Sequence, residues 1–287
     1  MAKQRIIEKK VLGEIVEANR NYNLIRPGDE ILIAVSGGKD SLVLAYLLEK
    51  LRRRVPFVFG VSAVTLDMNF SSKQKKQLSS WMEKQQIQYS IQSNNILTTV
   101  ENVVPPDKIP CSACARFRRG VLYNHAFEQK KVLALGHHAD DAIETLLMNI
   151  FFSGKIQALP PVLISNDKRN RLIRPLILVR ESSIVELQKT LELPVVSDCD
   201  CPGTEFLKQG ARKKMKNILA EIEKFADDTG NHFINSMQNI KISNMMDSNY
   251  FDYSSLNASW EQEKKQGPLW KGDLEGDDCS STSFESK

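Results

Sequence analysis

The chain has 287 residues, of which 41% are hydrophobic and 26% charged, and its formal net charge is +4 at pH 7. This composition is that of a globular protein and excludes a chain that is disordered throughout. The length favours one sizeable α/β domain with smaller additions. The N-terminus, MAKQRIIEKKVLGEI, lacks the apolar stretch of a secretory signal, and no run of membrane-spanning length follows it. We therefore expect a cytoplasmic protein with no membrane partner.

The first half of the chain alternates between patterns of helices and strands. Residues 3–22 carry apolar residues at helical spacing, which predicts an amphipathic N-terminal helix. Short apolar runs then predict strands near 31–35, 59–66, 88–92 and 132–135, and helices are predicted near 42–51, 74–86, 115–128 and 139–152. This alternation predicts an α/β fold with a mostly parallel, doubly wound sheet, and ligands that bind beyond the carboxyl ends of its strands.

A glycine turn follows the first of these strands, where the sequence reads SGGKDS from Ser36 to Ser41. Gly37 and Gly38 allow a tight turn whose backbone N–H groups can approach a phosphate, and the next helix adds the positive end of its dipole. Lys39 and the two serines add a positive charge and hydroxyl donors. The GxxxxGK[ST] pattern of γ-phosphate hydrolysis is absent. The hexapeptide resembles the turn of PP-loop ATP pyrophosphatases, which split ATP between the α and β phosphates.

Two further polar segments lie where predicted strands end. Asp67 ends the second strand, where its carboxylate could accept hydrogen bonds from the ribose or base of a nucleotide, or could only cap a turn. The segment GHHADDAIET after the fourth strand begins with Gly136 and His137, and this histidine can donate to a phosphate. Asp140 and Asp141 are hard oxygen ligands suited to Mg²⁺ with ATP, although two carboxylates at a helix start could serve only as caps.

Five cysteines in a chain without an export signal favour metal binding or redox chemistry over a disulfide framework. Cys111 and Cys114 form a CxxC pair just before an arginine-bearing helix, whereas Cys199, Cys201 and Cys279 lie far downstream. No second CxxC completes a four-cysteine zinc site. Three thiolates, from Cys111, Cys114 and Cys201, could hold three irons of a [4Fe–4S] cluster and leave the fourth iron open. A structural zinc ion is the main alternative.

The order of these motifs resembles that of the tRNA 2-thiocytidine synthetase (TtcA) family. The match also includes CSACARFRRG at 111–120, IRPL at 173–176, RE at 180–181 and SMQN at 236–239, and it covers about residues 5–253. The resemblance implies ATP and Mg²⁺ dependence, a [4Fe–4S] cluster held by three cysteines, and 2-thiolation of cytidine 32 in the tRNA anticodon loop. It also implies a homodimer that receives sulfur from a cysteine desulfurase.

The resemblance also assigns roles to individual residues. It implies ATP binding by the turn and by three residues at other strand ends, namely Ser36, Gly37, Gly38, Lys39, Asp40, Ser41, Asp67, Gly136 and His137. Lys39, Asp40 and Asp141 are implied to be catalytic, and Asp140 and Asp141 to bind Mg²⁺. Arg116, Arg118 and Arg119 are candidates for tRNA binding or for positioning the reacting base.

Some alternatives stay open at this point. The sequence departs from the family at the third cysteine, where CDCPGTEFLKQGAR replaces the usual CxxCGSQ, so Cys199 is the alternative ligand to Cys201. A tRNA uridine is the alternative target. Lysidine-type modification uses the same adenylation without sulfur, but it gives no role to Cys111 and Cys114. A zinc-stabilised tRNA-binding module would leave the glycine turn unexplained.

The patterns together predict four parts of the chain. An N-terminal helical segment (1–28) precedes a PP-loop ATP-binding α/β domain (29–180). A helical region (181–253), with helices near 183–191, 206–225 and 232–243, is expected to complete the active site. The polar residues 254–287, rich in Gly, Ser, Asp and Glu, predict a disordered tail.

Overall fold

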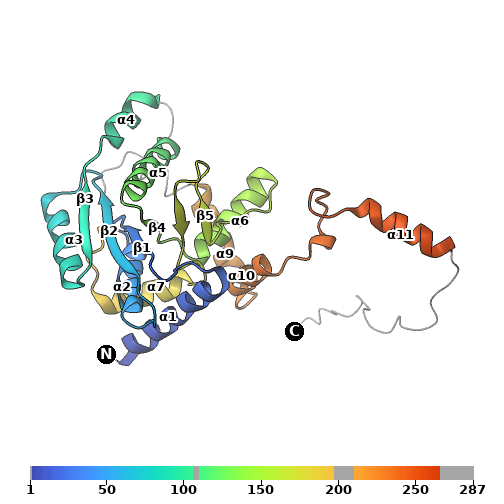
Figure 1. Cartoon of the computed structure of the whole chain (residues 1–287), viewed down its shortest axis with the longest axis horizontal. Coiled ribbons are helices and arrows are strands. Elements are labelled where there is room, and N and C mark those ends of the chain that lie inside the picture. The colour runs from blue at the N-terminus through green and yellow to red at the C-terminus, as the bar shows by residue number, and fades with distance from the viewer. Residues whose placement is uncertain (1, 106–109, 197–209, 266–287) are drawn as a thin grey trace. The chain divides into compact units, whose positions relative to one another are not determined.

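The computed structural model describes residues 2–105, 110–196 and 210–265 (Figure 1). The chain divides into two compact units, residues 1–235 and 236–287, of which the first contains the sheet. In the second unit the structure has a short 3-10 turn (Ile242–Asn244) and helix α11 (Tyr253–Lys265). The helix lies in the segment that was expected to be disordered. Within the described residues, no helix has the length and apolar character needed to cross a membrane.

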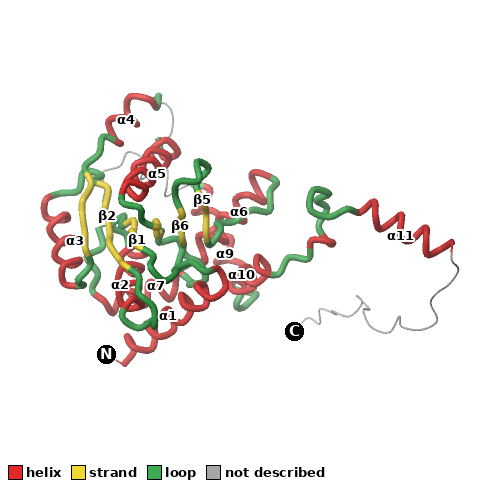
Figure 2. The backbone as a smooth tube through the Cα atoms, in the orientation of Figure 1, coloured by secondary structure: helices red, strands yellow, loops and turns green. Residues whose placement is uncertain are grey.

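Six strands form one sheet with the order β3-β2-β1-β4-β6-β5 (Figure 2). They are β1 (Glu30–Ala34), β2 (Gly60–Leu66), β3 (Gln88–Gln92), β4 (Val132–Ala134), β5 (Val162–Ile164) and β6 (Arg171–Ile173). All neighbouring strands are parallel except β5 and β6. The predicted mostly parallel sheet is therefore confirmed. The β5–β6 pair was missed because three residues are too few to show a strand pattern.

The helices of the first unit largely follow the predicted order. They are α1 (Ala2–Tyr22), α2 (Lys39–Arg52), α3 (Ser72–Lys84), α4 (Ile96–Val103), α5 (Cys111–Glu128), α6 (Ala139–Ser153), α7 (Glu181–Leu191), α9 (Ala211–Ile222) and most of α10 (Thr229–Gln238). Helix α4 was not predicted. Helix α5 begins at Cys111, four residues before its predicted start, so the CxxC pair lies on the helix itself and not in the loop before it.

Helices α2 and α5 cover opposite faces of the sheet. The connection from β1 to β2 and the connection from β3 to β4 cross the sheet in opposite directions, and right-handed crossovers then place their helices on opposite sides. Under α5, Leu32, Leu133 and Leu172 form a row of register partners across three strands. Helix α2 is buried along most of its length and packs on β1, β2 and α7. The first turn of α2 is thereby fixed at the carboxyl end of β1.

Candidate functional site

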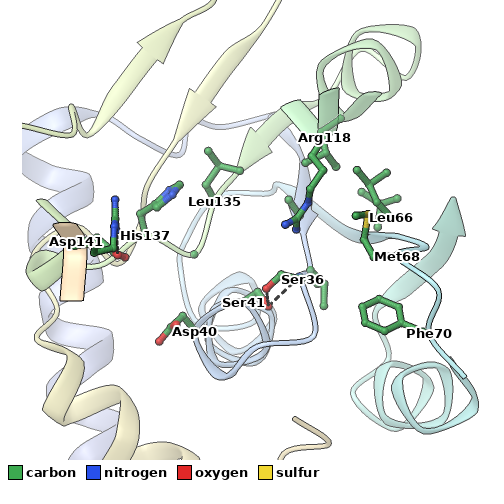
Figure 3. A pocket seen from close by; sticks show the side chains of 16 residues that line it. Ser36, Asp40, Ser41, Leu66, Met68, Phe70, Arg118, Leu135, His137 and Asp141 are labelled. Atoms are coloured by element: carbon green, nitrogen blue, oxygen red, sulfur yellow. Dashed lines mark hydrogen bonds and ion pairs between the residues drawn. The ribbon is translucent and has the colours of Figure 1, made fainter. Parts of the chain in front are cut away.

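A cavity of about 400 Å³ opens where β1, β2 and β4 end, which is the edge of the sheet where ligands were expected (Figure 3). Its wall comes from five parts of the first unit. These are Ala34, Val35, Ser36, Asp40 and Ser41 around the glycine turn; Val64, Leu66, Met68 and Phe70 from β2 and beyond; Arg118 and Leu122 from α5; Leu135, Gly136, His137 and Asp141 from the β4–α6 connection; and Arg212 from α9.

The glycine turn is held in shape by its own serines. Ser36 N donates to Ser41 Oγ over 3.2 Å, and Gly38 N donates to Ser36 Oγ over 3.3 Å. Gly37 adopts a positive φ of 84°, which favours glycine, and its carbonyl accepts from Val196 N at 2.9 Å. Gly38 is the N-cap of α2, and no side chain caps the helix there. The first turn of α2 therefore offers backbone N–H groups to an anion.

Gly136 brings the β4–α6 connection against the first turn of α2. A Cβ atom on Gly136 would lie 3.0 Å from Ser41 N and 3.2 Å from the carbonyl carbon of Asp40. Both neighbours are backbone atoms of a buried helix, so they cannot move aside cheaply. Glycine is thus required at position 136 by the close approach of two backbone segments, which brings His137 and Asp141 to the same cavity as the glycine turn.

The two histidines of the GHH segment have different surroundings. His137 lines the cavity, and burial, aided by Arg174 and Arg212, lowers its pKa to about 4 although Asp141 acts in the opposite direction. Its ring is therefore neutral at neutral pH, and its buried Nδ1 has no hydrogen-bond partner among the described residues. His138 is the N-cap of α6, where its Nδ1 accepts from Asp141 N and its own N–H donates to Asp141 Oδ2.

The two aspartates that follow also differ. Asp141 lines the cavity, and its Oδ1 accepts from Arg212 Nη1 at 2.7 Å. Asp140 is buried and accepts from both Nε and Nη2 of Arg180 and from the backbone N–H of Glu181. Asp140 thus joins α6 to the start of α7, whereas Asp141 faces the ligand space. Among the described residues, no three His, Cys, Asp or Glu side chains are grouped to hold a metal ion.

Two of the expected ATP-binding side chains do not line the cavity. Lys39 Nζ donates to Glu181 Oε1 at 2.9 Å and lies 3.0 Å from Asp40 Oδ1. Burial alone would lower the pKa of Lys39, but Asp40 and Glu181 raise it, so the ammonium group stays charged. Asp67 accepts from Phe70 N and from Lys75 Nζ. Asp67 thus caps the turn after β2, and its role in ATP binding stays a prediction.

One side of α5 leads from the cysteines into the cavity. Cys111, Cys114, Arg118 and Leu122 are three or four residues apart, so they fall along one stripe of the helix. Arg118 and Leu122 line the cavity, and Figure 3 shows the Arg118 side chain reaching from α5 toward the Ser36–Ser41 turn. Cys111 and Cys114 are half-buried. The CxxC pair therefore lies on the same stripe of α5 as the two residues that line the cavity.

The cysteine pair and the cavity also share a hydrophobic cluster. Cys114 packs on buried residues that include Leu66 and Met68, and both of these line the cavity. Cys199 and Cys201 lie outside the described residues, so the choice between them as cluster ligand stays a prediction. The residues on both sides of that segment lie at the site, because Val196 bonds to Gly37 and Arg212 lines the cavity.

Comparisons with known proteins agree with this architecture. The PP-loop domain family matches residues 7–219. The chain belongs to the PP-loop family. It is 33% identical over 89% of its length to a tRNA-cytidine(32) 2-sulfurtransferase of Coxiella burnetii, of which it covers 99%, and 34% identical over 88% of its length to one of Tolumonas auensis, of which it covers 83%. These relatives confirm the family that the motifs predicted.

A solved PP-loop structure shares the fold. The U34-tRNA thiolase NcsA from Methanococcus maripaludis, solved with its [4Fe-4S] cluster, superposes with a TM-score of 0.65 over 82% of this chain and 78% of that chain. The two sequences are 24% identical, so the likeness concerns the fold. The PP-loop α/β architecture predicted from the sequence is thereby confirmed.

Three residues of this PP-loop site were not singled out from the sequence. Met68 and Phe70 form the wall beyond β2, and their only signal is that they follow the LD pair that ends this strand. Arg212 lies in the basic run RKKMK at 212–216, a pattern that is typical of a solvated helix face. In the structure Arg212 donates to Asp141 and lies 3.7 Å from Glu144. Its role in the site became visible only with these partners on α6.

Substitution by alanine should affect the stability of the protein differently at Gly38 and at Gly136. Gly38 has a φ of −74°, and a methyl group there would meet only Ser36 Oγ at 3.4 Å, so Gly38→Ala should change the free energy of unfolding by less than about 1 kcal/mol. Gly136→Ala forces backbone apart and should lose about 1–3 kcal/mol. The affinity for ATP should fall in both variants. In Gly38→Ala it falls because the added methyl group obstructs the bound phosphate. Denaturant unfolding and calorimetric titration with ATP would measure this. A Gly136→Ala protein as stable as the wild type would contradict the close approach.

Glu144 predicts a pH-dependent stability. It is 4% exposed, and burial raises its pKa to about 7 despite nearby Arg212. Between pH 4.5 and 7 the folded protein holds a proton that the unfolded chain has lost, so stability falls as the pH rises through this window. Glu144→Gln should therefore raise the free energy of unfolding by roughly 2 kcal/mol at pH 8 and change it little at pH 4.5.

Glu49 supplies the matched control for this experiment. It is equally buried, and burial alone would raise its pKa, but hydrogen bonds from Arg52 and Arg53 lower it. Glu49→Gln should therefore destabilise the protein at pH 8, the opposite sign to Glu144→Gln. Urea unfolding at the two pH values measures both. A Glu144→Gln variant that gains nothing at pH 8 would contradict the raised pKa.

Proposed function

We propose that this protein is an ATP-dependent tRNA sulfurtransferase that replaces the C2 oxygen of cytidine 32 in the anticodon loop with sulfur. The proposal is supported by the tRNA-cytidine(32) 2-sulfurtransferases of Coxiella burnetii and Tolumonas auensis, which resemble the chain over most of its length. The match of residues 7–219 to the PP-loop domain family also supports it. Since mature tRNA is its substrate, we place the reaction in the cytoplasm.

One observation carries the proposal: the helix that carries the CxxC pair also places Arg118 in the cavity beside the glycine turn. Arg118 enters this cavity one helical turn after Cys114, and a rise of about 6 Å separates the two along α5. A nucleobase in the cavity could therefore meet the ATP phosphates on one side and a sulfur source on the other. A hydrolase or a lysidine-type enzyme has no use for two half-buried thiols at this position.

The first chemical step that we propose is adenylation of the base. The ATP phosphates bind at the uncapped start of α2, where Ser36 and Ser41 keep the N–H groups in place. The C2 oxygen attacks the α-phosphorus, a P–O bond forms, and pyrophosphate leaves with the bonding electrons. The neutral ring of His137 can donate to a phosphate oxygen. Arg118 lines the cavity, where its positive charge can stabilise the negative charge that develops.

The second step replaces the activated oxygen with sulfur. Sulfur at the sulfide level attacks C2, the S–C2 bond forms, the C2–O bond breaks, and AMP leaves with both electrons, so that the base is not oxidised. A persulfide from the sulfur donor reaches this level only after a thiol reductant cleaves its S–S bond with two electrons. The base must be turned out of the anticodon loop to reach this depth. Met68 and Phe70 give the cavity an apolar wall opposite His137 and Asp141 (Figure 3). This wall is suited to the flat face of a nucleobase.

Mg²⁺ fits the site with a revised set of ligands. Asp141 faces the cavity, so we keep it, with Asp40, as a candidate ligand of a Mg²⁺ ion that takes most of its other ligands from phosphate and water. The oxygens of Asp140 are held by Arg180 and by Glu181 N–H, which suits a structural role better. Lys39 we propose as a positioning residue, because its pair with Glu181 joins α2 to α7.

The cysteine pair fits an iron–sulfur cluster. Cys111 and Cys114 occupy the first turn of α5, where the helix dipole favours the thiolate, and their spacing places both sulfurs on the stripe that leads to the cavity. Cys201, with Cys199 as the alternative, is the proposed third ligand. A [4Fe–4S] cluster held by three cysteines supplies an iron that is open to bind sulfur.

The partners follow from the same proposal. A cysteine desulfurase is proposed as the sulfur donor, and a homodimer as the working assembly, on the strength of the family resemblance. tRNA is the proposed substrate, and Arg116 and Arg119 are exposed on α5, where they can contact phosphates.

The direct test is mass spectrometry of tRNA nucleosides from bacteria that lack 2-thiocytidine and carry this gene. The wild-type protein should restore 2-thiocytidine, and Cys111→Ser and Cys114→Ser should abolish it while Cys279→Ser keeps it. Arg118→Ala should lower the thiolation rate by about a hundredfold, and Arg118→Lys should retain part of it because the positive charge stays. A thiouridine in place of 2-thiocytidine would change the substrate, and lysidine or no modified base would overturn the proposal.

A further inference from the structure

The outer side of α5 combines three features that no contact with residues 2–105, 110–196 or 210–265 explains. Arg116 and Arg119 are exposed and have no ion pair among the described residues. The first seventeen residues of the helix, from Cys111 to Phe127, contain no acidic side chain. Gly120 lies in the middle of the helix, although glycine is a poor helix former. Each feature disfavours an isolated helix or leaves its stability unchanged, and no contact within the part of the chain that the structure describes explains it.

No contact among the described residues requires glycine at position 120. Its φ is not among the positive values, so its backbone is one that any residue adopts. A Cβ atom at Gly120 would meet no atom of the described residues within 4 Å. By contrast, Gly136 is required by the backbone of α2, and a Cβ on Gly230 would collide with the Arg180 guanidinium group. The space beside Gly120 is therefore open to a partner that approaches the helix backbone closely.

The surroundings of Gly120 specify the chemistry of that partner. Arg116 lies one turn before Gly120, and Arg119 is its neighbour. The other exposed positions nearby are Ser112 and Ala115, which are short, and Asn124, which is uncharged. A surface with two arginines that lack partners, no carboxylates and a shallow gap between them complements a polyanion. The positive end of the α5 dipole adds to the same field.

The position of this surface selects RNA among polyanions. On the opposite side of the same part of α5, Arg118 and Leu122 line the cavity. A strand that delivers a splayed base into the cavity must run along its rim, and α5 forms part of that rim (Figure 3). A free nucleotide would be held inside the cavity and would not reach Gly120.

We infer that the outer face of α5, formed by Ser112, Ala115, Arg116, Arg119 and Gly120, is where the tRNA backbone next to the target base is clamped, and that Gly120 is the point of closest approach. The inference rests on the proposed function and adds to it a named contact surface. Arg116 and Arg119 pair with phosphates on either side of the gap. Arg118 acts in the reaction itself, whereas Arg116 and Arg119 bind the substrate.

The test uses substitutions whose effects on stability and binding have opposite signs. Gly120→Ala fills open space in an exposed helix, so it should raise the Tm by about 2–4 °C. It should nevertheless weaken the binding of full-length unmodified tRNA. Gly120→Leu should weaken it by about tenfold or more, since the larger side chain holds the backbone away, which corresponds to ~1.4 kcal/mol.

Gly13 in α1 provides the matched control. It too lies within a helix, is exposed, and would meet nothing within 4 Å if it carried a Cβ atom. Gly13→Ala should raise the Tm like Gly120→Ala, and both Gly13→Ala and Gly13→Leu should leave tRNA affinity unchanged. Arg116→Ala should lower the slope of log Kd against log salt concentration by roughly 0.7 to 0.9, as the loss of one phosphate contact requires.

The outcomes separate this inference from the proposed function. Fluorescence anisotropy gives the tRNA affinity, and nucleoside mass spectrometry gives the thiolation. If the wild type thiolates tRNA and Gly120→Leu binds and thiolates tRNA equally well, the inference is overturned and the function stands. If Gly120→Leu binds tRNA normally but loses thiolation only when sulfur comes from a protein donor, the face serves that donor and the RNA clamp is wrong. If the wild type yields no thiolated base while Gly120→Leu still loses tRNA affinity, the clamp stands and the proposed reaction falls.

Discussion

The contact between Gly136 and the first turn of α2 is the constraint on which the site depends. It joins the ends of β1 and β4 backbone to backbone, with 3.0 Å between Ser41 N and the position where a Cβ of Gly136 would lie. Because α2 is buried on the sheet and α6 begins just after Gly136, this contact fixes the phosphate turn relative to His137 and Asp141. A larger residue would separate the two halves of the cavity before it changed any functional side chain.

Charged side chains behind this contact hold the surrounding helices together. Lys39 and Lys216 both donate to Glu181, and these two hydrogen bonds lower the pKa of Glu181 to about 2 although its burial acts to raise it. Arg180 joins Asp140 to Glu223. Such partly buried pairs orient helices more than they stabilise the fold, since desolvation offsets much of their attraction. Among the described residues, the charged groups that line the ligand space are Asp40, Arg118, Asp141 and Arg212.

The elements that could be predicted from the sequence are those whose signals occupy one continuous stretch of the chain. The SGGKDS turn, the GHHADD segment and the apolar periodicity each occupy a continuous stretch, and the turn, Gly136, His137 and Asp141 do meet at one edge of the sheet. Sequence reasoning failed where a role depends on a partner from another element. Asp140 and Asp141 look alike in sequence, and only Arg180 and Arg212, on other helices, distinguish them. The start of α5 was placed too late because Pro110 and the cysteines favour a loop, whereas packing of Cys114 on the Leu66–Met68 cluster extends the helix.

The central claim is that the cysteine stripe of α5 and the phosphate turn of α2 serve one bound substrate. A crystal structure of the anaerobically purified protein with a non-hydrolysable ATP analogue, phased with anomalous data at the iron edge, tests this claim most directly. We expect iron density next to Cys111 and Cys114, and the α-phosphorus over the Ser36–Ser41 turn. The iron site and the phosphate should both be open to the same cavity. Iron separated from the nucleotide by packed protein, or zinc in place of iron, would contradict it.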